Sequence, residues 1–350
     1  MAVLAVGRRI RGARPIPTNW HTVGIFLTSG IGDTVVATGA LEDLRDAYPD
    51  ARIVLFVTAN NASFARLLTT PDSVVELPVR QLARAIKAVR AEQCDVVVDL
   101  GAWRRFDAVL SILSGARARV GLRTPGQFRH TGYDVVVDHG REHEIENDRR
   151  LLAAVGVAST SEPSLALPPD ATAPLDRPYA VFHLWPGGAN FDERSWPVEA
   201  WRALARALRS RGLEIVLTGG PGDVDVTKRL IAAWNRDGLL AHNAAGGTWP
   251  ESIAWLRFAE GVVSVNTGVM HVAAALGTPT VALNGPTSGT RWGPRGRYTR
   301  CVASPMVPDG YLNLGFEHDD RYRDCMAAIT VDMVVTAWDD LMTEVRTTSS

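Results

Sequence analysis

A carboxylate stands at the end of a glycine-rich turn near the start of the chain. The turn Ser29-Gly30-Ile31-Gly32 follows an apolar run and leads directly into Asp33. A carboxylate at the mouth of a strand can remove the proton from a hydroxyl group held beside it. Asp also caps helices, and an N-cap for a helix that starts at Thr34 is the more common role. The residues alone leave both roles open, and no second carboxylate is expected beside Asp33.

A second polar turn lies between two apolar strands in the other half of the chain. Asn266-Thr267-Gly268-Val269 follows the run 261–265 and opens a helix of small residues, and the next strand ends at Gly285-Pro286-Thr287. Strand–turn–helix units place free N–H groups at the carboxyl edge of a parallel sheet, where an anionic or hydroxyl-rich ligand can bind. His271 can contact such a ligand, although pairing with backbone carbonyls in a buried turn is the more common role.

Two further glycine turns follow predicted strands. After the first, Gly187 and Gly188 allow a close approach of N–H groups to phosphate, and Arg194 adds a fixed positive charge. The alternative is a solvated loop in which Arg194 pairs with Asp192 or Glu193. After the second, Gly220 precedes Asp223.

The carboxylate of Asp223 has three possible roles. It can accept bonds from ribose hydroxyls, bind a divalent metal together with Asp225, or stabilise a helix N-terminus. We favour the helix role strongly over the metal and slightly over ribose. His271 has no second His four residues away, and the cysteines do not cluster, so the sequence predicts no metal site.

Composition narrows the classes of function. The chain has 350 residues, 46% hydrophobic and 21% charged, with a formal net charge of −1, which gives no sign of nucleic-acid binding. No apolar run approaches the roughly 20 residues that span a bilayer, and residues 1–20 indicate a tail rather than a signal peptide. Three scattered cysteines, Cys94, Cys301 and Cys325, favour a reducing cytoplasm.

Strands and helices alternate along the chain, which predicts an α/β fold with parallel sheets. In the first half we expect strands at 23–28, 53–57, 74–77, 95–100 and 118–121, a loop at 29–33, and helices at 35–47, 62–68, 81–91 and 103–113. In the second half we expect strands at 179–184, 214–218, 261–265 and 280–283, and helices at 197–211, 224–234, 249–258 and 331–345.

The two halves are predicted to be copies of one architecture. A polar, proline-rich stretch at 159–177 is the candidate linker between them. The predicted organisation is an N-terminal tail at 1–20, a Rossmann-like domain at 21–165, a second at 176–330, and a C-terminal helix and tail at 331–350.

Together these motifs resemble glycosyltransferase family 9, the heptosyltransferases of lipopolysaccharide core synthesis, over residues 23–341. Single motifs are weak, but their order and spacing are specific. The matching segments are Gly32-Asp33, Ala37-Thr38-Gly39-Ala40-Leu41, Pro186-Gly187-Gly188, Arg194-Ser195-Trp196-Pro197, Thr218-Gly219-Gly220, Thr267 to Gly277, Gly285-Pro286-Thr287, Trp292-Gly293-Pro294 and Cys325-Met326.

The resemblance implies a GT-B architecture, in which two Rossmann-like domains face each other across a cleft and a terminal helix can cross back to the first domain. It implies inverting, metal-independent transfer from a nucleotide sugar, typically ADP-heptose, to a glycan or small-molecule hydroxyl, with no cofactor. The first domain would hold the acceptor and the second the nucleotide sugar. Peripheral association with a membrane stays open.

The resemblance also implies roles for individual residues. The catalytic carboxylate falls on Asp33, and Ser29, Gly30 and Gly32 lie on the acceptor side. The phosphate-binding basic residue falls on Arg194, where lysine is common. The donor-binding set is Gly187, Gly188, Arg194, Asn266, Thr267, Gly268, Val269 and His271, and the nucleoside-binding set is Gly220, Asp223, Pro286 and Thr287.

Two residues depart from the family pattern. Asn266 replaces an Asp that contacts the donor, so we interpret it as a donor-specificity position, with helix capping as the alternative. Leu27 stands where a basic residue often ends the first strand in the family. We therefore expect no anionic group on the acceptor at this position. The composition suggests a GC-rich genome, and a secondary-metabolite acceptor is therefore an alternative to lipopolysaccharide.

Two other functions compete with glycosyl transfer. One is a nucleotide-sugar epimerase of similar shape, which the sparse set of carboxylates and histidines in the first half disfavours. The other is a non-catalytic protein that binds a sugar nucleotide. A nicotinamide oxidoreductase is disfavoured because the glycine turn lacks the full G-x-G-x-x-G pattern and no acidic residue ends the next strand.

Overall fold

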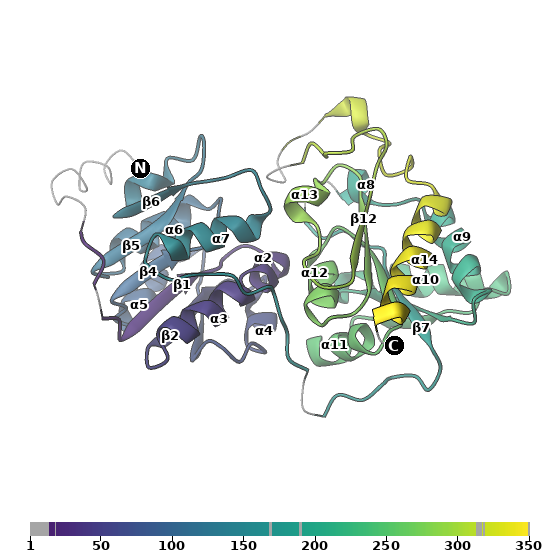
Figure 1. Cartoon of the computed structure of the whole chain (residues 1–350), viewed down its shortest axis with the longest axis horizontal. Helices are drawn as coiled ribbons and strands as arrows, with labels where there is room; N and C mark the ends of the chain where they lie inside the picture. The colour runs from purple at the N-terminus through teal and green to yellow at the C-terminus, as the bar shows by residue number, and fades with distance from the viewer. Residues whose placement is uncertain are drawn as a thin grey trace. The chain divides into compact units, whose positions relative to one another are not determined.

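The chain divides into two compact units, which are described separately: residues 1–163 and residues 164–350. The computed structural model describes residues 14–17, 19–167, 170–188, 191–312, 317 and 319–348 (Figure 1). Most of the predicted N-terminal tail, residues 1–13 and 18, lies outside the described residues.

The first unit is a six-stranded parallel sheet with helices on both faces. Its strand order is β3-β2-β1-β4-β5-β6, so the order reverses between β1 and β4. The strands are β1 (Thr22–Phe26), β2 (Arg52–Val57), β3 (Ser73–Glu76), β4 (Val96–Asp99), β5 (Ala118–Arg123) and β6 (Val135–Asp138). The helices are α2 (Ile31–Val36), α3 (Thr38–Ala47), α4 (Ala62–Ala65), α5 (Leu82–Ala91), α6 (Arg105–Leu113), η1 (Arg129–Gly132) and α7 (Glu144–Ala153).

The apolar strands explain why this sheet is buried on both sides. Val23 and Ile25 of β1 belong to a core with residues of α3 and α7, whereas Phe26 belongs to a second core with residues of α5 and α6. Successive side chains of a strand point to opposite faces, so near-continuous apolar strands require helices on both.

The second unit repeats this topology, which confirms the predicted pair of parallel sheets. Its strand order is β12-β11-β10-β7-β8-β9, with the reversal between β7 and β10. The strands are β7 (Tyr179–His183), β8 (Glu214–Gly219), β9 (His242–Ala245), β10 (Gly261–Val265), β11 (Thr280–Asn284) and β12 (Thr299–Ala303). The helices are α8 (Phe191–Arg194), α9 (Val198–Arg209), η2 (Pro221–Asp223), α10 (Val224–Arg236), α11 (Trp249–Arg257), α12 (Gly268–Ala275), α13 (Gly289–Trp292), η3 (Asp320–Tyr322) and α14 (Val331–Thr348).

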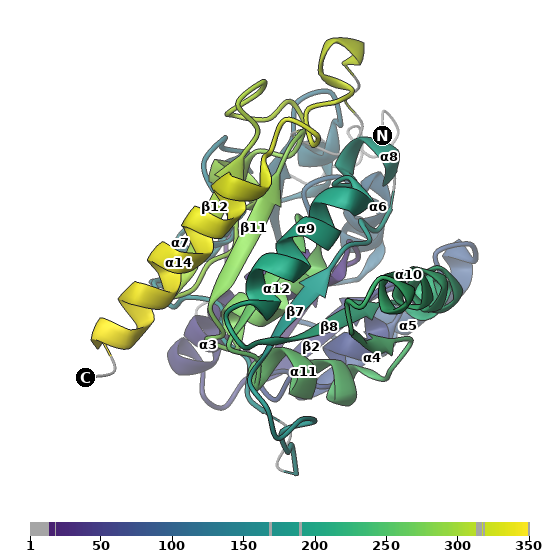
Figure 2. The ribbon, with the colours of Figure 1, turned by 90° about the vertical axis from the view of Figure 1, so that its right-hand side faces the viewer.

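The terminal helix α14 packs on the second unit, next to α9 and β12 (Figure 2). Its Trp338 is buried against Gly261 of β10, where a larger residue would meet the indole ring. Ion pairs Arg211–Asp339 and Arg300–Glu344 hold its outer face. Trp338 and these ion pairs therefore tie α14 to the core of its own unit.

No helix among the described residues is long and apolar enough to span a membrane.

Several predicted boundaries were wrong. The loop predicted at 29–33 ends early because α2 begins at Ile31, and the helix predicted at 35–47 is interrupted at Ala37. Sequence reading also missed β6, α7, β9 and β12, whose short or polar segments carry weak periodicity.

The start of the predicted linker is an ordered part of the first unit. Asp43 of α3 accepts hydrogen bonds from the Ser159 and Ser161 hydroxyls and from the N–H groups of Thr160 and Ser161, at 2.6 to 3.1 Å. These bonds hold the pKa of Asp43 below its usual value despite the opposing effect of burial. The N–H of Leu165 already bonds to the Ala275 carbonyl in the second unit.

This packing predicts that Gly39→Ala destabilises the protein. A Cβ at Gly39 would meet the backbone carbonyl of Ser161 well inside van der Waals contact, and neither backbone can yield freely. We expect a loss of about 1–3 kcal/mol in the free energy of unfolding, measured by urea denaturation. Gly222→Ala is the control, since nothing lies within 4 Å of a Cβ there. Equal stability of the two variants would contradict the packing.

Candidate functional site

Asp33 lies at the carboxyl end of β1, where the strand order of the first sheet reverses. Ligands of open α/β sheets bind at such reversals, because the loops of neighbouring strands diverge there. The sequence predicted that the residues from Ser29 to Asp33 form a turn at the end of this strand, and all of them are partly exposed. Gly30 and Asp33 are brought together directly, since the Gly30 N–H donates to Asp33 Oδ2 at 3.0 Å.

The helix-capping alternative for Asp33 was wrong in its detail. Gly30 is the N-cap of α2, and Asp33 is the third residue of the helix, from which its side chain reaches back to the Gly30 N–H. Burial raises the pKa of Asp33 to about 6, and the negative charge of Glu144 contributes to the increase. The hydrogen bond from the Gly30 N–H and the positive charge of Arg104 both lower the pKa. At neutral pH the carboxylate is therefore ionised and more basic than an exposed Asp.

Two acidic residues of α7 accompany Asp33, contrary to the expectation that it stands alone. Glu144 and Asp148 are both buried and lie one helical turn apart. Burial raises the pKa of Asp148 well above its usual value, and the charges of Glu144 and Asp33 raise it further. Sequence reading missed them because it predicted no helix here, although the spacing of four was visible.

A buried polar network supports the same edge of the sheet from below. Arg129 Nη2 donates to Asp99 Oδ2 at 2.6 Å and to the Tyr133 hydroxyl at 3.1 Å, and all three side chains are fully buried. Thr28, the residue before the predicted turn, donates its hydroxyl to Asp107 at 2.7 Å. The network anchors the ends of β1 and β4, from which the turn at Ser29 departs.

Asp107 is the group in this network that titrates near neutrality. Burial and the charge of Asp99 raise the pKa of Asp107 to about 7, against the opposing effects of Arg129 and the Thr28 bond. Two carboxylates share one guanidinium, so the second carboxylate holds a proton readily. The sequence analysis identified none of the residues in this buried network. Each is an isolated polar residue at or near the end of an apolar strand, and such a residue carries no recognisable motif.

In the second unit, Arg194 joins two of the predicted turns. Its Nη1 donates to the Gly187 carbonyl at 2.7 Å and its Nη2 to the Asn266 carbonyl at 2.5 Å. The alternative pairing with Asp192 or Glu193 does not occur among the described contacts, and Glu193 instead accepts from the Tyr311 hydroxyl at 2.7 Å. Burial lowers the pKa of Arg194. The structure thus places a partly buried cation between the Gly187 and Asn266 turns.

The side chain of Asn266 does not cap the following helix, so that alternative was wrong. Its Nδ2 donates to Asn284 Oδ1 and to the Trp292 carbonyl, both at 2.8 Å, and Thr267 is the N-cap of α12. An Asp here could donate neither bond. Asn266 therefore ties the end of β10 to the end of β11 and to α13.

The remaining predicted donor residues fall on two elements. Thr267, Gly268 and Val269 form the partly exposed start of α12, where N–H groups point out of the helix. His271 is buried within the same helix. Gly187 and Gly188 are exposed, and Gly188 has a φ of 81°, a conformation that favours glycine.

The predicted nucleoside residues lie at the ends of β8 and β11. Asp223 Oδ2 accepts the Gly220 N–H at 2.8 Å, so its helix role is present, in the same arrangement as Gly30 and Asp33. Pro286 is buried and its carbonyl accepts the N–H groups of Tyr311 and Leu312, both at 2.8 Å. Thr287 is partly exposed and pairs with Leu312 in an isolated bridge.

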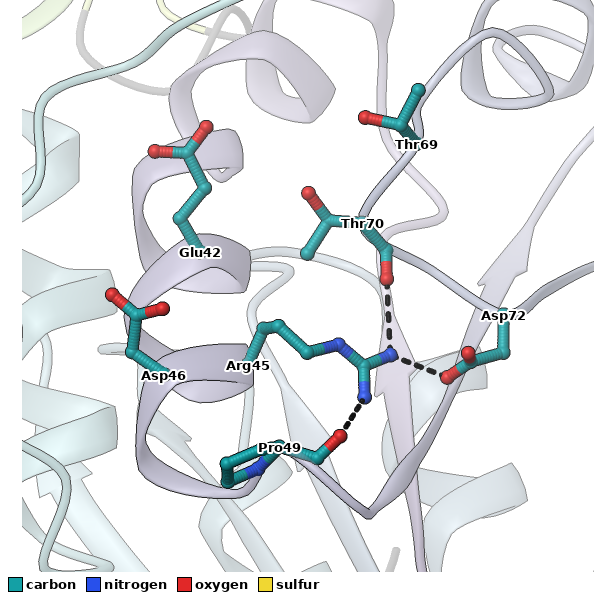
Figure 3. Close-up of a pocket in the computed structure, with 7 residues that line it drawn as sticks. All are labelled: Glu42, Arg45, Asp46, Pro49, Thr69, Thr70 and Asp72. Atoms are coloured by element: carbon teal, nitrogen blue, oxygen red, sulfur yellow. Dashed lines mark hydrogen bonds and ion pairs between the residues drawn. The ribbon is translucent and has the colours of Figure 1, made fainter.

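A separate hollow of about 430 Å³ lies in the first unit, away from these residues. Its lining comes from α3, the turn that follows α3 and the segment before β3, and consists of Glu42, Arg45, Asp46, Pro49, Thr69, Thr70 and Asp72 (Figure 3). The Arg45 side chain extends across the hollow, donates a hydrogen bond to the Thr70 carbonyl and forms an ion pair with Asp72.

Within the described ranges, no group of three His, Cys, Asp or Glu residues is arranged to hold a metal ion.

The raised pKa of Asp33 predicts that Asp33→Asn stabilises the folded protein at alkaline pH. A carboxyl whose pKa is higher when folded binds its proton more tightly when folded. Stability is therefore lost as pH rises through the window from about 4 to about 6. Differential scanning fluorimetry should show a higher Tm for Asp33→Asn at pH 8 and a smaller gain at pH 4. Asp50→Asn, at an exposed position, is the control. A lower Tm for Asp33→Asn at pH 8 would contradict the burial cost.

Comparison with known proteins identifies the family. Residues 82–309 match the profile of "Glycosyltransferase family 9 (heptosyltransferase)". Lipopolysaccharide heptosyltransferase 1 of Escherichia coli K12 is 26% identical over 321 residues, which cover 83% of this chain and 95% of that protein.

Solved structures show the same fold. The ADP-heptose lipopolysaccharide heptosyltransferase II of E. coli aligns with a TM-score of 0.77 at 20% identity, covering 93% of this chain and 99% of that one. The iron-containing dodecameric glycosyltransferase TibC of enterotoxigenic E. coli aligns with a TM-score of 0.60 at 16% identity, covering 93% and 77%. The fold is GT-B, with two Rossmann-like units, and the chain belongs to glycosyltransferase family 9.

Proposed function

We propose that this glycosyltransferase moves heptose from ADP-heptose to a hydroxyl group of a glycan or small-molecule acceptor, with inversion and without a metal. The heptosyltransferase relatives and the name of the E. coli ADP-heptose enzyme support the donor. The observation that carries the proposal is Asp33, a partly exposed carboxylate of raised pKa at the strand reversal of the first unit.

Asp33 would act as the general base. Direct displacement at the sugar carbon requires removal of the acceptor proton on the face opposite the leaving diphosphate. A base works best when its pKa approaches the working pH without exceeding it, and a value of about 6 meets that condition. Ser29, Gly30 and Gly32 would line the acceptor side. Leu27 is buried in the core, so it supplies no contact to an acceptor.

The second unit would hold the donor. Arg194, the N–H groups of Gly187 and Gly188, and the start of α12 from Thr267 to Val269 would stabilise the leaving diphosphate. Gly220, Asp223, Pro286 and Thr287 would lie beside the nucleoside, at the ends of β8 and β11. Asn266 and His271 would shape the donor pocket from β10 and α12. In this proposal Arg194 and backbone N–H groups neutralise the charge that a metal neutralises in other transferases.

We propose that the reaction takes place in the cytoplasm. The three cysteines of the chain are free thiols, as expected in a reducing compartment. The transferase could still work at a membrane surface if its acceptor is lipid-linked, so peripheral association is retained as part of the proposal.

Loss of the Asp33 carboxylate should abolish most of the transferase activity. We expect Asp33→Asn and Asp33→Ala to reduce kcat by about 100-fold or more, the scale of a lost general base, with little change in ADP affinity. The assay is ADP release from ADP-heptose with a panel of glycan and small hydroxylated acceptors. Asp50→Asn is the control and should keep the wild-type rate. Near-normal kcat in Asp33→Ala would remove Asp33 from the mechanism.

Replacement of Arg194 should weaken binding of the nucleotide product. We expect Arg194→Ala to raise the Kd for ADP about tenfold or more, because a charge-assisted contact to phosphate is lost. Arg194→Lys should recover part of the affinity, since it keeps the charge but not the fork geometry. Isothermal titration calorimetry measures both. Arg206→Ala removes an exposed cation of the same unit as a control, and an unchanged Kd in Arg194→Ala would leave Arg194 a purely structural role.

A further inference from the structure

Two buried polar residues support the turn that carries Asp33. Thr34 follows Asp33 in α2, and Asn61 is the N-cap of α4, in the loop after β2. Both residues are fully buried. We propose that Thr34 and Asn61 are positioning residues, which hold the Gly30 peptide and thereby fix the direction of the Asp33 carboxylate. The inference rests on the proposed role of Asp33 as the base.

The side-chain amide of Asn61 is held in one orientation by three hydrogen bonds. Its Oδ1 accepts the Thr58 N–H at 3.1 Å, and its Nδ2 donates to the Leu27 carbonyl and to Thr34 Oγ1, both at 2.8 Å. The reverse orientation would place Oδ1 against the Leu27 carbonyl and Nδ2 against the Thr58 N–H. Since a carbonyl only accepts and an N–H only donates, a single orientation satisfies both. Both protons of Nδ2 are therefore used.

The Thr34 hydroxyl connects Asn61 to the Gly30 peptide. Because Thr34 Oγ1 accepts a hydrogen bond from Asn61, its own proton is directed to another acceptor. That acceptor is the Gly30 carbonyl at 2.8 Å, which also accepts the Thr34 N–H at 3.2 Å. The N–H of Gly30 donates to Asp33 Oδ2 at 3.0 Å. Gly30 is therefore held at its carbonyl, and its N–H in turn holds the carboxylate.

The hydroxyl of Thr34, rather than its bulk, is the group that acts on the turn. A general base must point at the proton that it removes, and an error of about 1 Å in position can lower the rate about 100-fold. Valine has nearly the shape of threonine and would fill the same buried space. It would, however, accept nothing from Asn61 and donate nothing to the Gly30 carbonyl.

The first test measures the Gly30 turn by NMR without any substrate. Labelling with ¹³C-carbonyl serine and ¹⁵N-glycine selects the three Ser-Gly pairs of the chain, which end at Gly30, Gly115 and Gly289. The Gly30 signal is assigned as the one that is lost in Ser29→Ala. In Thr34→Val we expect the Gly30 N–H to exchange with solvent about tenfold faster, the scale of one lost hydrogen bond. Gly115 and Gly289 report any general loss of stability and should not change.

A conservative variant and a matched control separate the hydroxyl from the space that it fills. Thr34→Ser keeps the hydroxyl and should keep slow exchange at Gly30. Thr280→Val removes an equally buried hydroxyl of the second unit, which donates to the Thr278 carbonyl at 2.8 Å, and should leave Gly30 unchanged. Asn61→Asp is a second variant of the network. A carboxylate cannot donate to Thr34, so the Gly30 N–H should again exchange faster. Circular dichroism establishes that each variant is folded.

The second test measures the rate of transfer. We expect Thr34→Val to lower kcat about tenfold, because the base is no longer fixed, while the KM for ADP-heptose stays within about twofold. Thr34→Ser should recover most of the kcat that valine loses, and Thr280→Val should keep the wild-type rate. Thr34→Val combined with Asn61→Asp should be no slower than the slower single variant, since both changes remove the same connection to Gly30.

The two tests separate failure of this inference from failure of the proposed function. If the wild type transfers heptose but Thr34→Val keeps the wild-type kcat or the wild-type exchange at Gly30, only the inference fails. An equal loss in Thr34→Ser would also overturn it, because the hydroxyl would then not be the cause. If the wild type transfers no heptose, the proposed function fails, and the exchange at Gly30 still decides whether Thr34 holds the turn. If Thr34→Val does not fold, Asn61→Asp is measured in its place.

Discussion

Keeping a half-buried carboxylate ionised is the constraint on which the first unit depends. Asp33 has lost much of its hydration, and a buried charge is tolerated only when hydrogen bonds and nearby charges offset that loss. The Gly30 N–H and Arg104 favour the charged form, while Glu144 disfavours it. The balance leaves a base that is ionised at neutral pH yet stronger than an ordinary Asp. The polar network of Asp99, Arg129 and Tyr133 stabilises the strand ends that carry it.

The same hydrogen-bonded arrangement at a helix N-terminus occurs in both units. Gly30 with Asp33 and Gly220 with Asp223 are both a glycine N-cap whose N–H bonds to an Asp three residues later. In the first unit the Asp lies beside the buried acids of α7. In the second unit Asp223 follows β8, the counterpart of β2. The segment after β7, the counterpart of β1, carries Arg194 instead, which bonds to the Gly187 and Asn266 carbonyls. The repeated architecture therefore presents a carboxylate after β1 in one unit and a guanidinium after β7 in the other.

Sequence predicted the parts of this molecule that depend on apolar periodicity and on turn chemistry. The alternation of apolar strands and helices predicted two parallel sheets, and the glycine turns placed Asp33 and Asn266 at strand ends. Partners that come from distant segments could not be predicted. Glu144 lies on a helix whose residues are mostly polar, so its periodicity gave no signal. Asn266 looked exposed because nothing local shows that Asn284 and the Trp292 carbonyl take both of its N–H groups.

The account rests on one carboxylate acting as a base rather than as a nucleophile. A base allows a single displacement, which inverts the configuration of the anomeric carbon. A nucleophilic carboxylate forms a covalent sugar intermediate, and the second displacement restores the original configuration. The most direct measurement is the anomeric configuration of the glycosylated acceptor, determined by NMR of the product formed from ADP-heptose of known configuration. Inversion is the result that the account predicts, and retention would contradict it.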